Sequence, residues 1–304
     1  MKRFSIRILT QIFIGFILLN SCSAQTTKTL TLVGSTPIGK ELQTTFGIIS
    51  TNEYDFMKWE LNLNHNDQQF TLDLNYGESM PNTTGFINGG KEAQISGTYT
   101  ANVGQIANLN GKIYELKDSK TGNKFSFLQI DEHIFHLLSA NRTLLKGNDG
   151  YSYTLNNINS SSTNTAASSP TITSLAKNNT VNQFAFAGRT PCEEIATDNK
   201  LTVSDGCFKI KWSIVLNTDP QSLKPTTFSM KRINKGPDTI IGNWQVLKGI
   251  KAQPKAFVYQ LKSTNTNEIY NLLVGDDNVL FVLDKNFRLY PGNKLHSYTL
   301  NKKE

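Results

Sequence analysis

Apolar and polar side chains alternate along much of the chain. The period of two runs from Trp59 to Leu63, from Phe70 to Tyr76 and again from Ile210 to Leu216. This period is typical of strands with one buried face. Val279 to Leu283 is apolar throughout, as expected of a strand covered on both faces. Turn sequences such as Pro291-Gly292-Asn293 separate the runs, so the pattern predicts many short antiparallel strands.

The strand pattern occurs twice along the chain, as an internal repeat. The segment from Ile113 to Asn156 aligns without a gap with the segment from Val258 to Asn301, at an offset of 145 residues. Both segments close on Ser-Tyr-Thr-Leu-Asn. Further upstream, Lys58-Trp59 matches Lys211-Trp212, and Gly34 to Ile38 matches Gly188 to Cys192. The duplication therefore covers most of the chain.

The repeat divides the chain into four parts. Residues 1–21 form a leader, 22–157 a first β-domain, 158–182 a linker rich in Ser, Thr and Asn, and 183–304 a second β-domain. The linker has too few apolar residues to stay folded by burial. We expect an all-β fold in which each copy is a small antiparallel β-barrel or sandwich, because closure removes exposed sheet edges.

One short helix is expected near the start of each copy. In the second copy, Thr190-Pro191-Cys192-Glu193 has the spacing of a capping box, with proline at the first helical position. This predicts a helix of two or three turns that ends at about Leu201.

The first residues have the layout of a secretory signal. Lys2, Arg3 and Arg7 precede an apolar run from Ile8 to Leu19, which is shorter than the ~20 residues that a membrane span needs. Leu19-Asn20-Ser21-Cys22 resembles the lipobox of bacterial lipoproteins, which implies a lipid on Cys22. Cleavage after Ala24 is the alternative. With the lipid, we expect an outer-membrane protein of the cell envelope, on the periplasmic side or at the cell surface.

Export also bears on the cysteines. If Cys22 carries the lipid, Cys192 and Cys207 remain in an oxidising compartment, where two thiols usually bond. The first copy has Ile38 and about Tyr54 in their places, so it lacks both partners at once. We therefore expect a Cys192–Cys207 disulfide, with two unrelated buried thiols as the alternative.

Charge argues against a nucleic-acid partner. The net charge of +7 includes the three basic residues of the leader, which leaves 28 basic against 24 acidic residues. Nucleic-acid binders concentrate positive charge in a patch or stripe. Here the Lys and Arg residues are scattered among Asn, Thr and Ser.

Two local patterns resemble ligand sites. Gly34 to Lys40 has the spacing of a phosphate-binding loop, but Glu41 stands where that loop needs Ser or Thr. His133 and His136 have a spacing that can share a metal on a helix. In a strand they would point to opposite faces, so we interpret them as structural.

No catalytic constellation stands out. Glu193 and Glu194 could form a catalytic or metal pair, yet their place at a helix start is explained by the helix dipole. Aromatic residues at matching positions, Trp59 with Trp212 and Tyr153 with Tyr298, are expected to fill two equivalent cores. We expect no catalytic residue, metal site or cofactor, and no enzyme activity.

The stretch from Phe186 to Cys192 resembles the NlpE family of copper-resistance and surface-sensing envelope lipoproteins. The chain also looks like a set of uncharacterised envelope lipoproteins whose copies carry Cys-Phe-Lys-Ile-Lys-Trp, here Cys207 to Trp212. The resemblance implies a lipocalin-like barrel and a role in the envelope. The family's Cys-x-x-Cys is absent, because Glu193, Glu194 and Ile195 follow Cys192, so its thiolate metal binding does not carry over.

These observations lead to a hypothesis of function. We expect a lipid-anchored module that binds a small ligand or senses the state of the envelope, without catalysis. The alternative is a structural or interaction protein of the outer envelope that contacts another envelope protein. An apolar cavity would favour ligand binding, whereas barrels filled with side chains would favour interaction. The sequence does not define the oligomeric state.

Overall fold

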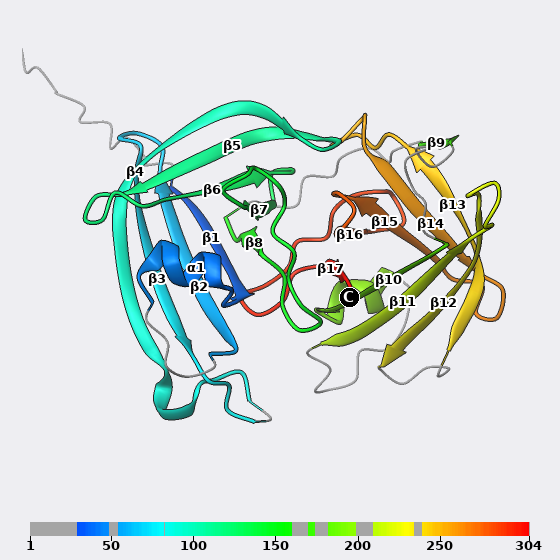
Figure 1. Ribbon diagram of the computed structural model, residues 1–304, viewed down its shortest axis with the longest axis horizontal. Coiled ribbons are helices and arrows are strands. Elements are labelled where there is room, and N and C mark those ends of the chain that lie inside the picture. The colour runs from blue at the N-terminus through cyan, green and yellow to red at the C-terminus, as the bar shows by residue number, and fades with distance from the viewer. Residues whose placement is uncertain are drawn as a thin grey trace, which may run out of the picture.

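The protein folds as two closed antiparallel β-barrels in tandem, each of eight strands (Figure 1). The computed structural model describes residues 29–48, 54–81, 83–159, 170–173, 182–198, 209–233 and 239–303. The all-β prediction is confirmed, and of its two forms the chain adopts the barrel.

The first barrel is built from strands that follow one another in sequence. They are β1 (Thr29–Pro37), β2 (Phe56–Asn64), β3 (Gln69–Gly77), β4 (Lys91–Ile106), β5 (Leu109–Asp118), β6 (Lys124–Gln129), β7 (Ile134–Leu138) and β8 (Thr154–Asn157). Helix α1 (Lys40–Phe46) follows β1, and the 3₁₀ turn η1 (Ile87–Gly89) precedes β4. Each strand pairs with the next, and β8 closes the barrel on β1.

The second barrel repeats this order. It consists of β10 (Gln183–Thr190), helix α2 (Glu193–Asp198), β11 (Ile210–Thr218), β12 (Pro225–Ile233), β13 (Ile240–Lys248), β14 (Phe257–Ser263), β15 (Ile269–Val274), β16 (Val279–Leu283) and β17 (Thr299–Lys302). Strand β17 pairs with β10 as β8 does with β1. The predicted all-apolar strand β16 is buried along its whole length.

The region between the barrels is more structured than predicted. Thr171–Thr173 forms strand β9, which pairs antiparallel with β13. Its side chains are exposed, with Ile172 at 75%. The linker composition offers too few apolar side chains to form a core. Strand β9 is instead held by main-chain pairing with β13, which needs no apolar side chain. The remaining linker residues, 160–169 and 174–181, lie outside the described residues.

The predicted capping box of the second copy was wrong. Helix α2 begins at Glu193, and the Cys192 carbonyl accepts the N–H of Ala196. Thr190 instead ends strand β10, where its hydroxyl accepts a hydrogen bond from the Trp212 indole N–H at 2.9 Å. The buried indole N–H finds its acceptor there, and the Thr190 hydroxyl donates to the Pro191 carbonyl at 3.1 Å. The predicted end at Leu201 lies outside the described residues.

The two barrel interiors are equivalent cores, as the repeat predicted. The bond from Trp212 to Thr190 has its counterpart in the first copy, where the Trp59 indole donates to Thr36 at 2.8 Å. Tyr153 and Tyr298 also lie in matching cores. Buried aliphatic and aromatic side chains occupy both interiors, as expected for barrels of eight strands.

A third apolar cluster joins the barrels. Its buried members come from both copies: Ile106, Leu109, Ile113, Leu128, Ile130, Ile134, Leu138, Leu144, Leu247, Ile250, Ala256, Val258, Leu273, Val279, Phe281, Leu283 and Leu289. Strands β5 to β7 and β14 to β16 therefore carry buried apolar side chains on both faces, one in a barrel and one between the barrels.

Polar contacts across this interface obey a pseudo-two-fold symmetry. The hydroxyls of Ser152 and Ser297 lie 2.6 Å apart, and these residues are separated by 145 positions, the offset of the repeat. Reciprocally, Asn301 accepts the N–H of Gly147 at 2.8 Å and Asn156 accepts the N–H of Gly292 at 2.9 Å. The barrels thus meet as the subunits of a symmetric dimer do, inside one chain.

Candidate functional site

The predicted lipid and disulfide sites are only partly within the described residues. Cys22 and Cys207 lie outside them. Cys192 is 2% exposed, belongs to the core of the second barrel and is disulfide-bonded. The assignment of Cys207 as its partner stays a prediction.

The two histidines singled out from the sequence are separated by the strand geometry. His136 lies in β7 and is fully buried, with one ring nitrogen 2.8 Å from the Thr154 hydroxyl and the other 2.9 Å from the Leu145 carbonyl. Burial lowers its pKa to about 4. His133 precedes the strand, beside the carboxylate of Glu132. The structure does not bring the two rings together as a pair of ligands.

The other sequence candidates are occupied by structural roles. Gly34 to Pro37 is part of β1 and pairs with β2, so its main chain is not available to cradle a phosphate. In α2, Glu194 accepts a hydrogen bond from the Tyr298 hydroxyl, which belongs to the second core. The other two histidines, His65 and His296, contact Tyr99 and Tyr151 respectively.

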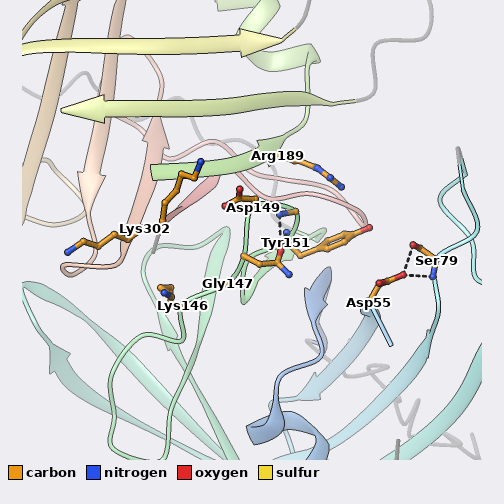
Figure 2. Close-up of a pocket in the computed structure, with 11 residues that line it drawn as sticks. Asp55, Ser79, Lys146, Gly147, Asp149, Tyr151, Arg189 and Lys302 are labelled. Carbon is orange, nitrogen blue, oxygen red and sulfur yellow. Dashed lines mark hydrogen bonds between the residues drawn. The ribbon is translucent and has the colours of Figure 1, made fainter. Parts of the chain in front are cut away.

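A cleft opens where the two barrels meet (Figure 2). Its volume is about 720 Å³, and both copies contribute to it. The lining residues are Asp55, Ser79, Lys146, Gly147, Asn148, Asp149, Gly150, Tyr151, Arg189, Lys302 and Lys303. Figure 2 shows Arg189, Tyr151 and Asp149 gathered around the centre of this group.

The loop from Gly147 to Tyr151 forms the floor of the cleft and is held rigidly. The Asn148 side chain accepts the N–H groups of Gly150 and Tyr151, both at 2.8 Å. The loop is also tied to the second barrel, since Gly147 donates to Asn301. The Tyr151 ring stacks on Phe56, with ring centroids 4.6 Å apart, which fixes its orientation.

One wall comes from the end of the first barrel. The Asp55 carboxylate accepts the N–H of Ser79 at 2.7 Å and also its hydroxyl. This carboxylate is therefore directed toward Ser79 rather than toward a cation, as Figure 2 shows.

Positive charge exceeds negative charge around the cleft. Among the described residues, no carboxylate forms an ion pair with Arg189. Neighbouring groups respond to this cation: the pKa of Lys209 is lowered by burial, then by Arg189 and by Lys211. The pKa of His296 is lowered to about 4 by burial, then by Lys209 and Arg189. A bound anion would relieve this repulsion.

The arrangement suits recognition of an acidic group. A guanidinium presents its N–H donors in a planar fork that matches carboxylate or phosphate oxygens. The lysines at positions 146, 302 and 303 add charge around it, and the flat face and hydroxyl of Tyr151 add a contact surface.

The cleft was not predicted from the sequence. Arg189 was noticed only as part of the matching segment, in which Ser35 is its counterpart. The Ser35 hydroxyl donates to the Lys294 carbonyl at 2.9 Å, so the symmetry-related position is closed by a neutral contact. The signal that could have found the site is this difference between otherwise matching copies.

Comparison of the chain with family models, with curated proteins and with solved structures gives no match. Within the described ranges, no three His, Cys, Asp or Glu residues are arranged to hold a metal ion. None of the helices in this part of the chain has the length and apolar character needed to cross a membrane.

Proposed function

We propose that this chain is a lipid-anchored envelope protein that binds a ligand carrying carboxylate or phosphate groups, without catalysis. The binding site is the cleft between the barrels, with Arg189 as the principal contact. The lipid on Cys22 would hold this site at the membrane surface.

The observation that carries the proposal is the guanidinium of Arg189, which forms no ion pair with any carboxylate of the described residues. It lines the cleft together with Lys146, Lys302 and Lys303. It also lowers the pKa of the neighbouring Lys209, after the larger effect of burial. A cation held among other cations is costly unless an anion is present for part of the time. The barrel interiors are occupied by side chains, so we place the ligand between the barrels rather than inside one.

The test is titration of the leaderless chain, with Cys22→Ser, by inorganic phosphate and by citrate at low ionic strength. We expect amide NMR shifts to concentrate at Gly147 to Tyr151 and around Arg189. The pKa of His296 should rise when the anion binds, because a nearby negative charge favours the protonated ring.

Arg189→Ser, which installs the residue found in the first copy, should weaken binding at least tenfold. Lys231→Gln is the matched control, since Lys231 is exposed on β12 and does not line the cleft. Equal affinity in Arg189→Ser and in the unmodified chain would contradict the proposal. Native mass spectrometry of protein from its own host would report the lipid and any retained anion together.

A second candidate is a structural or interaction protein of the outer envelope. The barrel interiors favour it, because buried aliphatic and aromatic side chains occupy both of them. Failure of both anions to shift the cleft resonances would favour this candidate.

A further inference from the structure

One side of strand β4 extends past its pairing with β3, and no described strand lies beside that part. Strand β4 pairs with β3 from Lys91 to Thr98 and with β5 from Gly97 to Ile106. The N–H of Tyr99 still donates to the Gln68 carbonyl at 2.8 Å. From Thr100 to Gln105, no described residue pairs with the side of β4 that faces away from β5.

The second barrel covers the corresponding edge. Strand β13 pairs first with β12 and then, from Val246 to Lys248, with β9. The pairing registers keep the offset of 145 residues, since Gly97 lies opposite Asp118 and Gly242 opposite Ser263. Val246 to Lys248 thus corresponds to Ala101 to Val103. Figure 1 shows β9 against β13, and the long β4–β5 ribbon reaching from the first barrel toward the second.

Within the described ranges, the first copy has no strand in the place that β9 occupies beside β13.

The bare edge also lacks the features that keep edges apart. Natural sheet edges are usually protected by charged residues, proline or bulges. Tyr99 to Ile106 contains no charged residue and no proline, and its ladder with β5 is regular. Val103 is 86% exposed. Such an edge is suited to pairing with another strand.

We propose that the free edge of β4 pairs with the same edge of a second copy of this chain, antiparallel and about a two-fold axis. Because Tyr99 donates across this edge, alternation directs the main-chain groups of Ala101, Val103 and Gln105 there as well. A register centred on Val103 pairs Val103 with itself and Ala101 with Gln105. An uncharged edge meets its own copy without repulsion, so the contact is self-complementary.

Sedimentation equilibrium of the leaderless Cys22→Ser chain tests this proposal independently of anion binding. We expect a reversible dimer. Val103→Lys places two ammonium groups side by side on the axis and should weaken dimerisation at least tenfold. Ile269→Lys is the matched control, because Ile269 is a 54% exposed strand residue on β15, away from this edge.

Equal urea midpoints for the variants would show that Val103→Lys acts on association and not on folding. A monomer at all concentrations would overturn the proposal, and so would a dimer that Val103→Lys leaves intact. A monomer that captures a β-strand peptide on β4 would likewise overturn it, by assigning the edge to a foreign partner.

Discussion

At the scale of single residues, the indole–threonine bond found in both barrels has a measurable contribution. Thr36→Val keeps the shape of the side chain but leaves the buried Trp59 N–H without an acceptor. An unsatisfied buried donor costs roughly 1–3 kcal/mol, so the free energy of unfolding should fall by that amount in urea titrations. Thr36→Ser retains the hydroxyl and should lose less. Equal losses in the two variants would show that the hydrogen bond is not the cause.

Buried histidine predicts a pH dependence. The pKa of His136 is lowered by burial from 6.5 to about 4, so the unfolded chain binds a proton in a range where the folded protein does not. Stability is therefore unaffected above pH 6.5 and declines as the pH falls toward 4, by up to about 3 kcal/mol from this residue. His296, with a pKa of about 4, acts in the same direction.

This pH dependence can be checked by measuring the free energy of unfolding at pH 7 and pH 4.5 for the unmodified chain and for His136→Gln. The variant should lose less stability on acidification, because glutamine does not titrate. Direct NMR titration of the His136 ring is the complementary measurement. A midpoint near 6.5 in the folded protein would contradict the expected burial effect.

At the scale of elements, two matching glycines allow β4 and β13 to cross their neighbours closely. A Cβ atom at Gly97 would lie 1.9 Å from the Lys117 carbonyl oxygen, and one at Gly242 would lie 2.0 Å from that of Lys262. We expect Gly97→Ala and Gly242→Ala to destabilise the protein by roughly 1–3 kcal/mol or more, since backbone must move. Gly85→Ala, whose new Cβ would find its nearest neighbour at 3.6 Å, is the control and should change little in the same urea titrations. Similar losses at all three positions would show that the close backbone approach is not the cause.

Strands were predictable from the sequence because alternation reports burial of one face. The ranges expected around Trp59 and Trp212 lie within the longer strands β2 and β11. The errors occurred where a polar group had two possible partners. Thr190 matched a helix cap locally, but its hydroxyl accepts a hydrogen bond from the indole of Trp212, which lies 22 residues further along the chain. A local sequence pattern could not reveal that contact. Strand β9 has exposed side chains, so hydrophobic pattern could not reveal it.

At the scale of the whole molecule, Gln253 links the barrels. It is fully buried. Its side-chain oxygen accepts the N–H of Asn110 at 2.8 Å, and its side-chain NH₂ donates to the carbonyls of Asn110 at 2.8 Å and Ile130 at 2.7 Å.

After proteolytic cutting of the linker, we expect the two halves to stay associated in gel filtration. Gln253→Ala should weaken their association at least tenfold, which corresponds to about 1.4 kcal/mol. Gln221→Ala, at an exposed loop position, is the control. Halves that separate freely on cutting the unmodified chain would contradict this.

The relation between the barrels could be predicted only in part. The repeat gave two equivalent cores, and the shared Ser-Tyr-Thr-Leu-Asn ending was visible as a motif. The sequence did not show which face of this motif lies where. Tyr153 and Leu155 enter the barrel, while Ser152 and Thr154 contact their counterparts in the other copy. One strand pattern cannot say which polar positions meet another barrel, so the cleft beside this interface was missed as well.

The pseudo-two-fold axis has a consequence for how this architecture can change. Two identical subunits must carry every substitution on both sides at once, whereas a fused pair can alter one side alone. Here one side holds arginine and the other serine, at Arg189 and Ser35. Because the two halves are joined in one chain, a substitution can change one side of the interface and leave the matching position on the other side unchanged.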